Sequence, residues 1–211
     1  GTLTGFDIDI AKALCEQMKA ECTFVTNDWD GIIPALQAKK FDAIIASMSI
    51  TPERLQKVDF SKKYYNTPPA IAVPKDSPIK SLDDLKGKSL GAQGSTTHSN
   101  YAEKHFPDSD VKMYPTADEY KLDIANGRID AVIDDIVVLS EWLKTDAGKC
   151  CKILTPLKVD VDINGNGAGI AVRKGDTALA DKFTAAIAGI RASGKYQEIN
   201  KKYFDFDVYG E

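Results

Sequence analysis

Hydrophobic positions along this chain switch between a helical spacing and short unbroken apolar runs. A helical pattern over residues 9–20 is followed at 22–26 (CTFVT) by the β-branched and aromatic composition of a strand. A second helical pattern over 31–40 precedes the apolar run 41–46 (FDAIIA), which predicts a buried strand. Helix and strand therefore alternate through the first part of the chain.

The same alternation continues to the C-terminus. The predicted elements there are strands at 89–93 and 129–133, helices beginning near Thr97 and at Asp135, and helices over 116–126, 176–193 and 195–203. Strands that alternate with helices predict an α/β fold with largely parallel sheets.

One stretch of the pattern occurs twice. Residues 32–47 (IIPALQAKKFDAIIAS) and 119–135 (EYKLDIANGRIDAVIDD) both contain an amphipathic helix, a basic turn and a strand with polar residues at its carboxyl end. This weak repeat predicts two similar lobes rather than one sheet. Because ligands of open α/β sheets bind beyond the carboxyl ends of the strands, we expect both polar ends to serve one cleft.

Two extended segments rich in proline, or in glycine and asparagine, are candidate crossovers between the lobes. They lie at 64–74 and 162–172. Two crossovers make the first lobe discontinuous, and such segments can absorb a domain rotation as a hinge. The predicted lobes are 1–67 with 168–211 for lobe 1, and 68–167 for lobe 2.

Composition narrows the class of protein. With 43% hydrophobic and 27% charged residues in 211, the chain is a globular protein with a sizeable core. A net charge of -4 argues against a nucleic-acid partner, which would require a basic stripe. No apolar run approaches the ~20 residues that span a bilayer, and no signal peptide begins at Gly1. We expect a mature or trimmed chain.

The four cysteines form two pairs in the sequence. Cys15 and Cys22 are close enough to bridge, which would indicate an oxidising compartment, although two small buried apolar side chains would also fit. Cys150 and Cys151 are adjacent, and are either free thiols or a strained vicinal bridge. Without C-x-x-C spacing and with two histidines in the chain, we expect no metal site and no cofactor.

Polar residues follow the apolar run 41–46 in the segment SMSITPER. Ser47 and Ser49 lie two residues apart, on one side of an extended segment, and Thr51 resembles an N-cap with proline next to it. Arg54 then falls in the first turn of a short helix, where its guanidinium offers a fork matched to a carboxylate. A surface arginine behind two capping serines is the plainer alternative.

A second polar cluster follows the strand 89–93. Gly94 permits a tight turn, and Ser95, Thr96 and Thr97 lead into a helix whose free N–H groups can bind an anion. An ordinary Ser/Thr cap would give the same sequence. The cluster is not a P-loop, because no Gly-Lys-Ser/Thr follows it.

Two further candidate site features are a pair of carboxylates and an aromatic residue. Asp134 and Asp135 close the strand 129–133 and point to opposite faces, so that one of them could hold an ammonium group or cap the next helix. Trp29, at a strand–helix junction, could stack on a ligand side chain or belong to the core, whereas Trp142 is assigned to packing. An arginine fork, free N–H groups, an aspartate and an aromatic together match a free α-amino acid.

These residues lie in motifs that resemble those of a known family. The motifs are GFDIDIAKALC, DWDGIIPALQAKKFDAIIASMSITPER, VDFS, LGAQGST, GRIDAVIDD and KKYFDFDVYGE. Together they resemble periplasmic amino-acid-binding proteins of ABC importers, in the lysine/arginine/ornithine- and histidine-binding branch, over nearly all of the chain. The Cys15 and Cys22 spacing is similar to that branch's disulfide.

The resemblance implies a two-lobed, hinged "Venus flytrap" that lies in the periplasm and closes on one amino acid. The closed form is then recognised by a membrane permease. By position, Arg54 and the Thr96 backbone would hold the α-carboxylate, and Asp135, helped by Ser49, the α-ammonium. Trp29 would stack on the ligand side chain. The remaining pocket positions are Ser47, Ser95 and Thr97. We expect a monomer without catalytic residues.

The sequence departs from the family in two respects. The family's first strand and its pocket-lining loop have no counterpart, because Gly1 matches a point after them. Ala46 stands where the cationic-amino-acid binders have serine, and Ala92 and Thr97 replace a larger apolar residue and a glutamine. We therefore expect a roomier side-chain end of the pocket, and an opine is a candidate ligand beside lysine, arginine, ornithine and histidine.

Two other functions are compatible with the same scaffold. An enzyme similar to cyclohexadienyl dehydratase would need a cleft acid, for which Asp134 and His98 are the candidates. No G-x-S-x-G elbow is present, and GSTTH does not form a recognisable triad. The ligand-binding domain of a membrane receptor is the second alternative.

Overall fold

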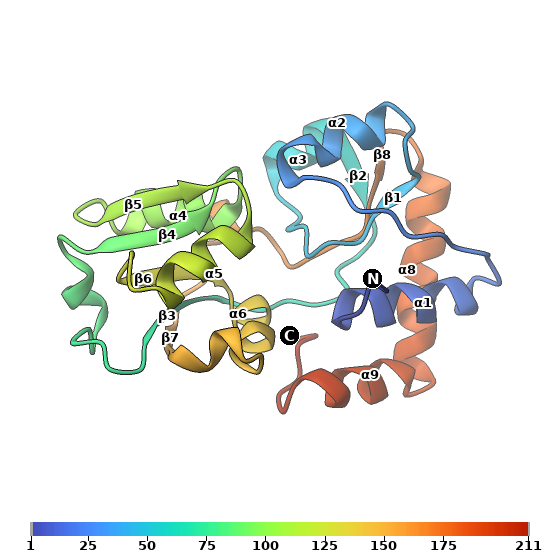
Figure 1. The fold of residues 1–211 in the computed structure, drawn as a ribbon. Helices are drawn as coiled ribbons and strands as arrows, with labels where there is room; N and C mark the ends of the chain where they lie inside the picture. The colour runs from blue at the N-terminus through green and yellow to red at the C-terminus, as the bar shows by residue number, and fades with distance from the viewer. Residues whose placement is uncertain (1, 211) are drawn as a thin grey trace. The chain divides into compact units, whose positions relative to one another are not determined.

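The structure is a computed structural model, and it describes residues 2–210. The chain divides into two compact units, one formed by the residues up to Asn66 together with those from Gly165 onward, and the other by Thr67–Asn164. We call them unit 1 and unit 2. Unit 2 is therefore an uninterrupted stretch of sequence, drawn in green to orange in Figure 1, whereas unit 1 combines both ends of the chain.

Unit 1 contains a three-stranded antiparallel sheet. Strand β8 (Ala171–Arg173) lies in the middle, between β1 (Ala43–Ile44) and β2 (Val58–Phe60). The core on this sheet contains Leu36, Ile44, Met48, Val58 and Ala171, all of which are buried. Short helices flank the strands: η1 (Trp29–Gly31), α2 (Ile32–Gln37) and α3 (Pro52–Lys57).

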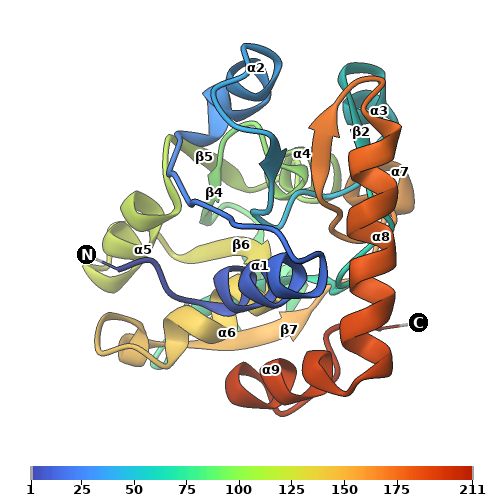
Figure 2. The same cartoon turned by 90° about the vertical axis from the view of Figure 1, so that its right-hand side faces the viewer.

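Three longer helices pack together in the same unit. They are α1 (Phe6–Gln17), α8 (Thr177–Ala192) and α9 (Lys195–Tyr203), and Figure 2 shows α8 running beside α1 and reaching α9. Phe6 joins them, because its ring makes edge contacts with Tyr65, Tyr196, Tyr203 and Phe204 at centroid distances of 5.4–6.2 Å. The helices predicted over 176–193 and 195–203 are confirmed.

Unit 2 contains a five-stranded mixed sheet in the order β5-β4-β6-β3-β7. The strands are β3 (Pro69–Pro74), β4 (Ser89–Gln93), β5 (Asp110–Tyr114), β6 (Ala131–Asp135) and β7 (Cys151–Pro156). Strand β4 runs parallel to β5 and β6, whereas β3 is antiparallel to both of its neighbours. The prediction of largely parallel sheets is wrong, because β3 and β8, the strands that follow the two crossings, run against their partners.

Helices cover both faces of this sheet (Figure 1). Alternate residues of β3 point to opposite faces: Ile71 and Val73 pack with α4 (Thr97–His105), and Ala70 and Ala72 with α5 (Ala117–Ala125) and α6 (Ile136–Leu143). The small alanines leave room for Tyr120 and Trp142 on the second face. The remaining elements are η2 (Leu82–Leu85), η3 (Ala147–Cys150) and α7 (Val161–Asn164).

The strand predicted over 22–26 is not formed. No strand among residues 2–210 pairs with this segment, and Phe24 and Val25 remain 37% and 64% exposed. A groove of about 460 Å³ lies between this segment, α1 and β1. A β-branched composition gives a strand only where a neighbouring backbone completes the hydrogen bonds, and none is present here. The strand predicted over 41–46 shortens to β1 for the same reason.

The cysteines differ in state. Cys15 and Cys22 form a disulfide that ties the end of α1 to the segment after it. Cys150 and Cys151 are free thiols, so the vicinal bridge is not formed. The peptide group that joins Cys150 to Cys151 is held in place, because its carbonyl oxygen, Cys150 O, accepts a hydrogen bond from Lys75 N at 2.9 Å.

Candidate functional site

The segment after β1 places Arg54 at the start of α3. Thr51 is the N-cap, and its Oγ1 accepts a hydrogen bond from Arg54 N at 3.2 Å, while Pro52 occupies the first helical position. The cap predicted from the sequence is confirmed. Because the helix begins here, the Arg54 side chain leaves from its first turn.

The guanidinium of Arg54 is held between an aromatic ring and a carbonyl. Its Nη1 donates to Ser49 O at 3.0 Å, and its central carbon lies 5.4 Å from the Trp29 ring centroid. The residue is half-buried, and burial lowers its pKa from the ordinary value. No acidic side chain within residues 2–210 forms an ion pair with it. The structure therefore brings Trp29, Ser49 and Arg54 together.

Ser47 is fixed by a second group of contacts. Its backbone is left-handed, with φ of 55°, and its N–H donates to the Tyr64 hydroxyl at 3.0 Å. Its Oγ donates to Asp7 Oδ2 at 2.9 Å, and Tyr64 OH donates to Asp7 Oδ1 at 2.8 Å. Burial raises the pKa of Asp7, partly offset by these hydrogen bonds from Tyr64 and Ser47.

Sequence reasoning missed Asp7 and Tyr64 as supports of Ser47. One signal was present for Asp7, which lies three residues before Ile10 and four before Ala11, and therefore on the buried face of α1. A carboxylate on a buried helix face needs donors, and here a serine and a tyrosine distant in sequence supply them.

In unit 2, the turn after β4 forms a capping box. Thr96 Oγ1 accepts from Ser99 N at 3.1 Å, and Ser99 Oγ accepts from Thr96 N at 3.2 Å. Ser95 has a left-handed backbone with φ of 58°, and Thr97 is the first residue of α4. The capping role that the sequence left open is therefore present, and Ser95, Thr96 and Thr97 lie together at the N-terminus of a nine-residue helix.

Asp135 ends β6 and caps α6. Its Oδ1 accepts from Val137 N at 2.8 Å, and its two oxygens accept from Thr67 Oγ1 at 2.7 and 2.8 Å. Thr67 is a partner that the sequence did not indicate. Strands β4 and β6 are parallel neighbours, so the turn at Thr96 and Asp135 lie at the same edge of the sheet.

Asp134 points into the protein and contacts two helices. Tyr120 OH on α5 donates to Oδ2, and His98 Nε2 on α4 lies 3.4 Å from Oδ1. The same Oδ1 accepts from Asp135 N at 2.7 Å. Burial and the Asp134 charge raise the pKa of Tyr120, which therefore stays protonated and donates.

The eight predicted residues thus form two groups of four, one in each unit. Unit 1 holds Trp29, Ser47, Ser49 and Arg54, and unit 2 holds Ser95, Thr96, Thr97 and Asp135. No group of three metal-binding side chains occurs in the described part of the chain.

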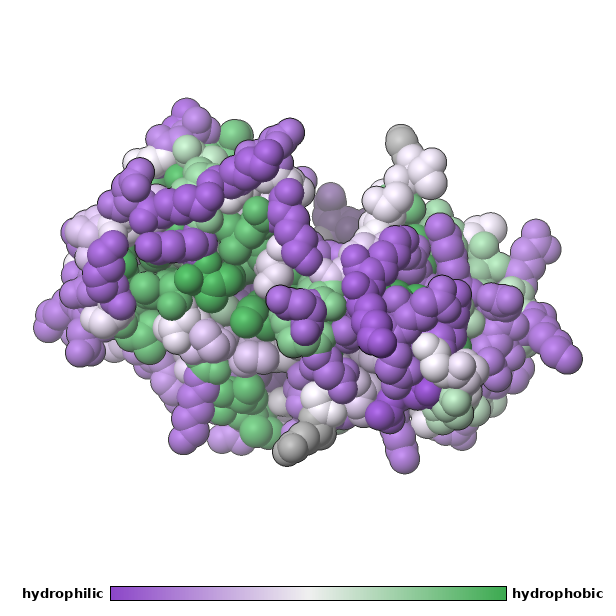
Figure 3. All heavy atoms as spheres, turned by 90° about the horizontal axis from the view of Figure 1, so that it is seen from below, coloured by the Kyte–Doolittle hydropathy of each residue, from purple (hydrophilic) through white to green (hydrophobic). Residues whose placement is uncertain are grey.

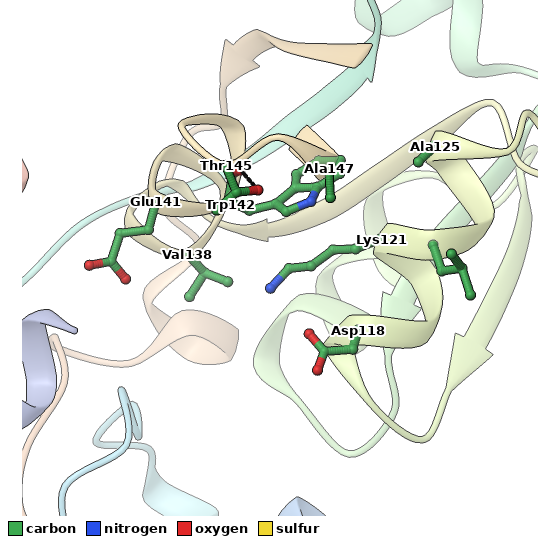
Figure 4. Close-up of a pocket in the computed structure, with 9 residues that line it drawn as sticks. Asp118, Lys121, Ala125, Val138, Glu141, Trp142, Thr145 and Ala147 are labelled. Atoms are coloured by element: carbon green, nitrogen blue, oxygen red, sulfur yellow. Dashed lines mark hydrogen bonds between the residues drawn. The ribbon is translucent and has the colours of Figure 1, made fainter. Parts of the chain in front are cut away.

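One groove in unit 2 lies elsewhere. It has a volume of about 520 Å³ and separates α5 from α6, with Lys121 extending from α5 toward Val138 on α6 (Figure 4). Hydrophobic side chains reach the surface over unit 2 (Figure 3), and in this groove Leu122 is 59% exposed. None of the eight predicted residues lines it. Trp142, which the sequence assigned to packing, forms part of its wall and is buried in the core.

Comparison with known proteins identifies the class. The sequence pattern of the bacterial extracellular solute-binding proteins, family 3, matches residues 1–206. The chain belongs to this family, as the motifs predicted. Among residues 2–210, no helix combines the length and the apolar character needed to cross a membrane.

Several relatives of this chain are named for an amino acid. An L-arginine-binding protein of Pseudomonas aeruginosa is 47% identical over 100% of this chain and 83% of its own length. The histidine-binding periplasmic protein of Escherichia coli is 42% identical over 100% and 82%. A solved periplasmic binding protein of Salmonella typhimurium, described as highly specific for arginine, is 36% identical with a TM-score of 0.87, over 96% of this chain and 90% of that one. The two-lobed fold class is confirmed.

Proposed function

We propose that this protein captures a free α-amino acid with a cationic side chain, arginine being the first candidate, and delivers it to the permease of an ABC importer. The two units would close on the ligand, with Arg54 and the Thr96 turn binding the α-carboxylate and Asp135 binding the α-ammonium. The ligand side chain would stack on Trp29. We place this activity outside the cytoplasmic membrane, in the periplasm, and expect a monomer.

The observation that carries the proposal is the state of Arg54. A half-buried guanidinium without an ion-pair partner among residues 2–210 is costly, because its charge is partly removed from water. Its donors are only partly used, since one hydrogen bond goes to Ser49 O. A ligand carboxylate would supply the missing charge through the bidentate geometry that arginine favours.

Unit 2 supplies the complementary groups. Asp135 already has its oxygens oriented by Thr67 and Val137 N, so little side-chain freedom is lost when an ammonium binds. The N-terminus of α4 adds a positive dipole end for the carboxylate, and Ser99 Oγ, which holds Thr96 N at 3.2 Å, would share or release that N–H.

The names of the relatives support a cationic side chain, since they specify arginine and histidine. A wider pocket would come from Ala46, which is half-buried and packs against the core of unit 1. Ala92 is fully buried in the core of unit 2, so its small size does not widen the pocket. An opine such as octopine, an N-carboxyethyl derivative of arginine, is therefore included among the test ligands.

Isothermal titration calorimetry with arginine, lysine, ornithine, histidine and octopine tests the proposal on protein refolded free of bound ligand. We expect 1:1 binding of at least one of them, weakened roughly 30-fold or more in Arg54→Ala and in Asp135→Asn, because each leaves a ligand charge unpaired. Absence of heat with all five would contradict the proposal.

Two exposed charged residues in unit 2 provide matched controls. Arg128→Ala removes a guanidinium whose side chain is 66% exposed, and Asp146→Asn removes a carboxylate whose side chain is 96% exposed. Both alter net charge as the site variants do, and neither residue belongs to the proposed site. Unchanged Kd values in these two variants would attribute the losses to the site.

An enzyme on this scaffold is the second candidate, and the contact between His98 and Asp134 favours it, since a buried acid next to a histidine suits proton transfer. Turnover of prephenate-like acids, lost in Asp134→Asn, would support this activity. The family relatives described above are named as binding proteins, which favours the first function.

A further inference from the structure

Asp134 is the one charged residue that is buried among residues 2–210, with 7% of its surface exposed. Asp134 belongs neither to the carboxylate anchor nor to the ammonium anchor of the proposed ligand site. A buried carboxylate costs several kcal/mol unless its lone pairs are satisfied, so a residue of this kind requires a reason in its contacts.

The contacts of Asp134 come from three separate places in unit 2. The Tyr120 hydroxyl approaches from α5, His98 Nε2 from α4 at 3.4 Å, and Asp135 N from the end of β6 at 2.7 Å. The carboxylate therefore connects α4 and α5, which lie on opposite faces of the sheet, to the backbone N–H of Asp135. His98 has a side chain that is 15% exposed, so this link is shielded from water.

These contacts join the carboxylate anchor to the ammonium anchor that unit 2 supplies to the proposed ligand site. His98 is two residues after Thr96, and it belongs to the first turn of α4, whose N-terminus would face the ligand carboxylate. Asp135 follows Asp134 directly and would face the ligand ammonium. Between strands β4 and β6 the ladder pairs Leu90 with Ala131 and Gly91 with Val132. Beyond this ladder of hydrogen bonds, Asp134 links the turn at Thr96 to the end of β6.

We propose that Asp134 is a positioning residue, which through His98 and the Asp135 backbone sets the spacing between the carboxylate and ammonium anchors of unit 2. This inference rests on the proposed function. A ligand that binds both anchors at once gains from their correct spacing, whereas a ligand that uses one anchor does not. Asp134 should therefore matter for complete α-amino acids and hardly for analogues that lack the carboxylate.

The test compares arginine with agmatine, which keeps the guanidinium and the amine but has no carboxylate. Calorimetry gives both Kd values for the native protein, Asp134→Asn, His98→Gln and the double variant. We expect arginine to bind roughly tenfold more weakly in each single variant, the size expected when a hydrogen bond to a charged group is lost. Agmatine should change less than about twofold, because the Asp135 anchor alone remains intact.

The double variant should bind arginine no more weakly than the worse single variant, because both changes break one link. Asp146→Asn, an equal change of charge on an exposed side chain, should leave both Kd values unchanged. Thermal melting and circular dichroism check that each variant is folded. If Asp134→Asn does not fold, His98→Gln, in which the carboxylate keeps Tyr120 and Asp135 N, provides the same comparison.

Three results would overturn the inference while leaving the proposed function in place. They are an unchanged arginine Kd in Asp134→Asn, an equal loss for arginine and agmatine, and additive losses in the double variant. A native protein that binds none of the five test ligands would instead overturn the proposed function, and the positioning role with it.

Discussion

The guanidinium of Arg54 lies over the indole of Trp29, at 5.4 Å from carbon to ring centroid. Its Nη1 is bonded at the same time to the Ser49 carbonyl at 3.0 Å. An arginine side chain has many rotamers, and these two contacts select one of them. Trp29 therefore holds the Arg54 side chain in place, in addition to any contact that it makes with a ligand.

Trp29 should report ligand binding by its fluorescence. The chain has two tryptophans, and Trp142 is buried at 6% exposure in the core of unit 2. We expect arginine to change the emission of the native protein and of Trp142→Phe, but not of Trp29→Phe. In addition, Trp29→Leu should weaken binding about fivefold, the upper value for an exposed cation–π contact, with Trp29→Phe losing less. A signal that follows Trp142 would contradict the assignment.

The ion pairs of Asp160 should make stability depend on pH in the acid range. Lys104 Nζ and His105 Nε2 lie 2.9 and 2.8 Å from its Oδ2, and they lower the pKa of Asp160 to about 2. Because the unfolded pKa is about 3.9, the stabilisation is present above that pH and is lost as pH falls toward 2. Urea unfolding should show the difference between native protein and Asp160→Asn shrinking from pH 4 to pH 2.

Asp7 should behave in the opposite way. Burial raises its pKa, so its protonated form is favoured in the folded state. The stability that this contributes is complete below the unfolded pKa of about 3.9 and is lost as pH rises through the folded value. The native protein should therefore lose stability relative to Asp7→Asn as pH increases from about 4. For each variant, the stability difference from the native protein is plotted against pH. If the Asp7 and Asp160 plots have slopes of the same sign, one of the two pKa directions is wrong.

The disulfide between Cys15 and Cys22 should stabilise the chain by about 2.5 kcal/mol, from the entropy of closing so short a loop. Denaturant unfolding of Cys15→Ser/Cys22→Ser measures this loss. Dithiothreitol should destabilise the native protein by the same amount and leave the double variant unaffected. Cys150→Ala serves as the control, since that thiol is free and its removal should preserve the effect of the reductant.

Gly165 should tolerate no side chain. Its φ is +71°, and a Cβ would overlap the Ile50 carbonyl oxygen. We expect Gly165→Ala to cost about 3 kcal/mol or more, because overpacking adds to the strain of a left-handed residue. Gly175, with a φ of +87° and open space around the position of a Cβ, provides the matched case, where alanine should cost about 1 kcal/mol from backbone strain alone. Equal losses would show that the Ile50 contact is unimportant.

Local chemistry made part of this structure predictable. The Thr51 and Thr96 caps, the helices that end the chain and strand β4 all follow from residues within a few positions of each other. The segment 22–26 could not be predicted in this way, since strand formation depends on a partner elsewhere in the chain. Strand direction was unpredictable for the same reason.

The site residues divide along the same line. Arg54, Thr96 and Asp135 could be proposed from the sequence because each follows a strand or begins a helix, positions at which side chains and free backbone groups can face a ligand. Asp7, Tyr64 and Thr67 support these groups from distant parts of the sequence. No local pattern records such contacts, because they exist only once the chain has folded.

The middle position of β8 also constrains the order in which the chain can fold during synthesis. Both β1 and β2 pair with β8, and β8 begins at Ala171, after all of unit 2. As the ribosome releases the chain, unit 2 has its complete sequence first and can fold, whereas β1 and β2 must wait without a partner. The segment that holds β1 and β2 is thus more exposed to chaperones and proteases than unit 2 until β8 has emerged.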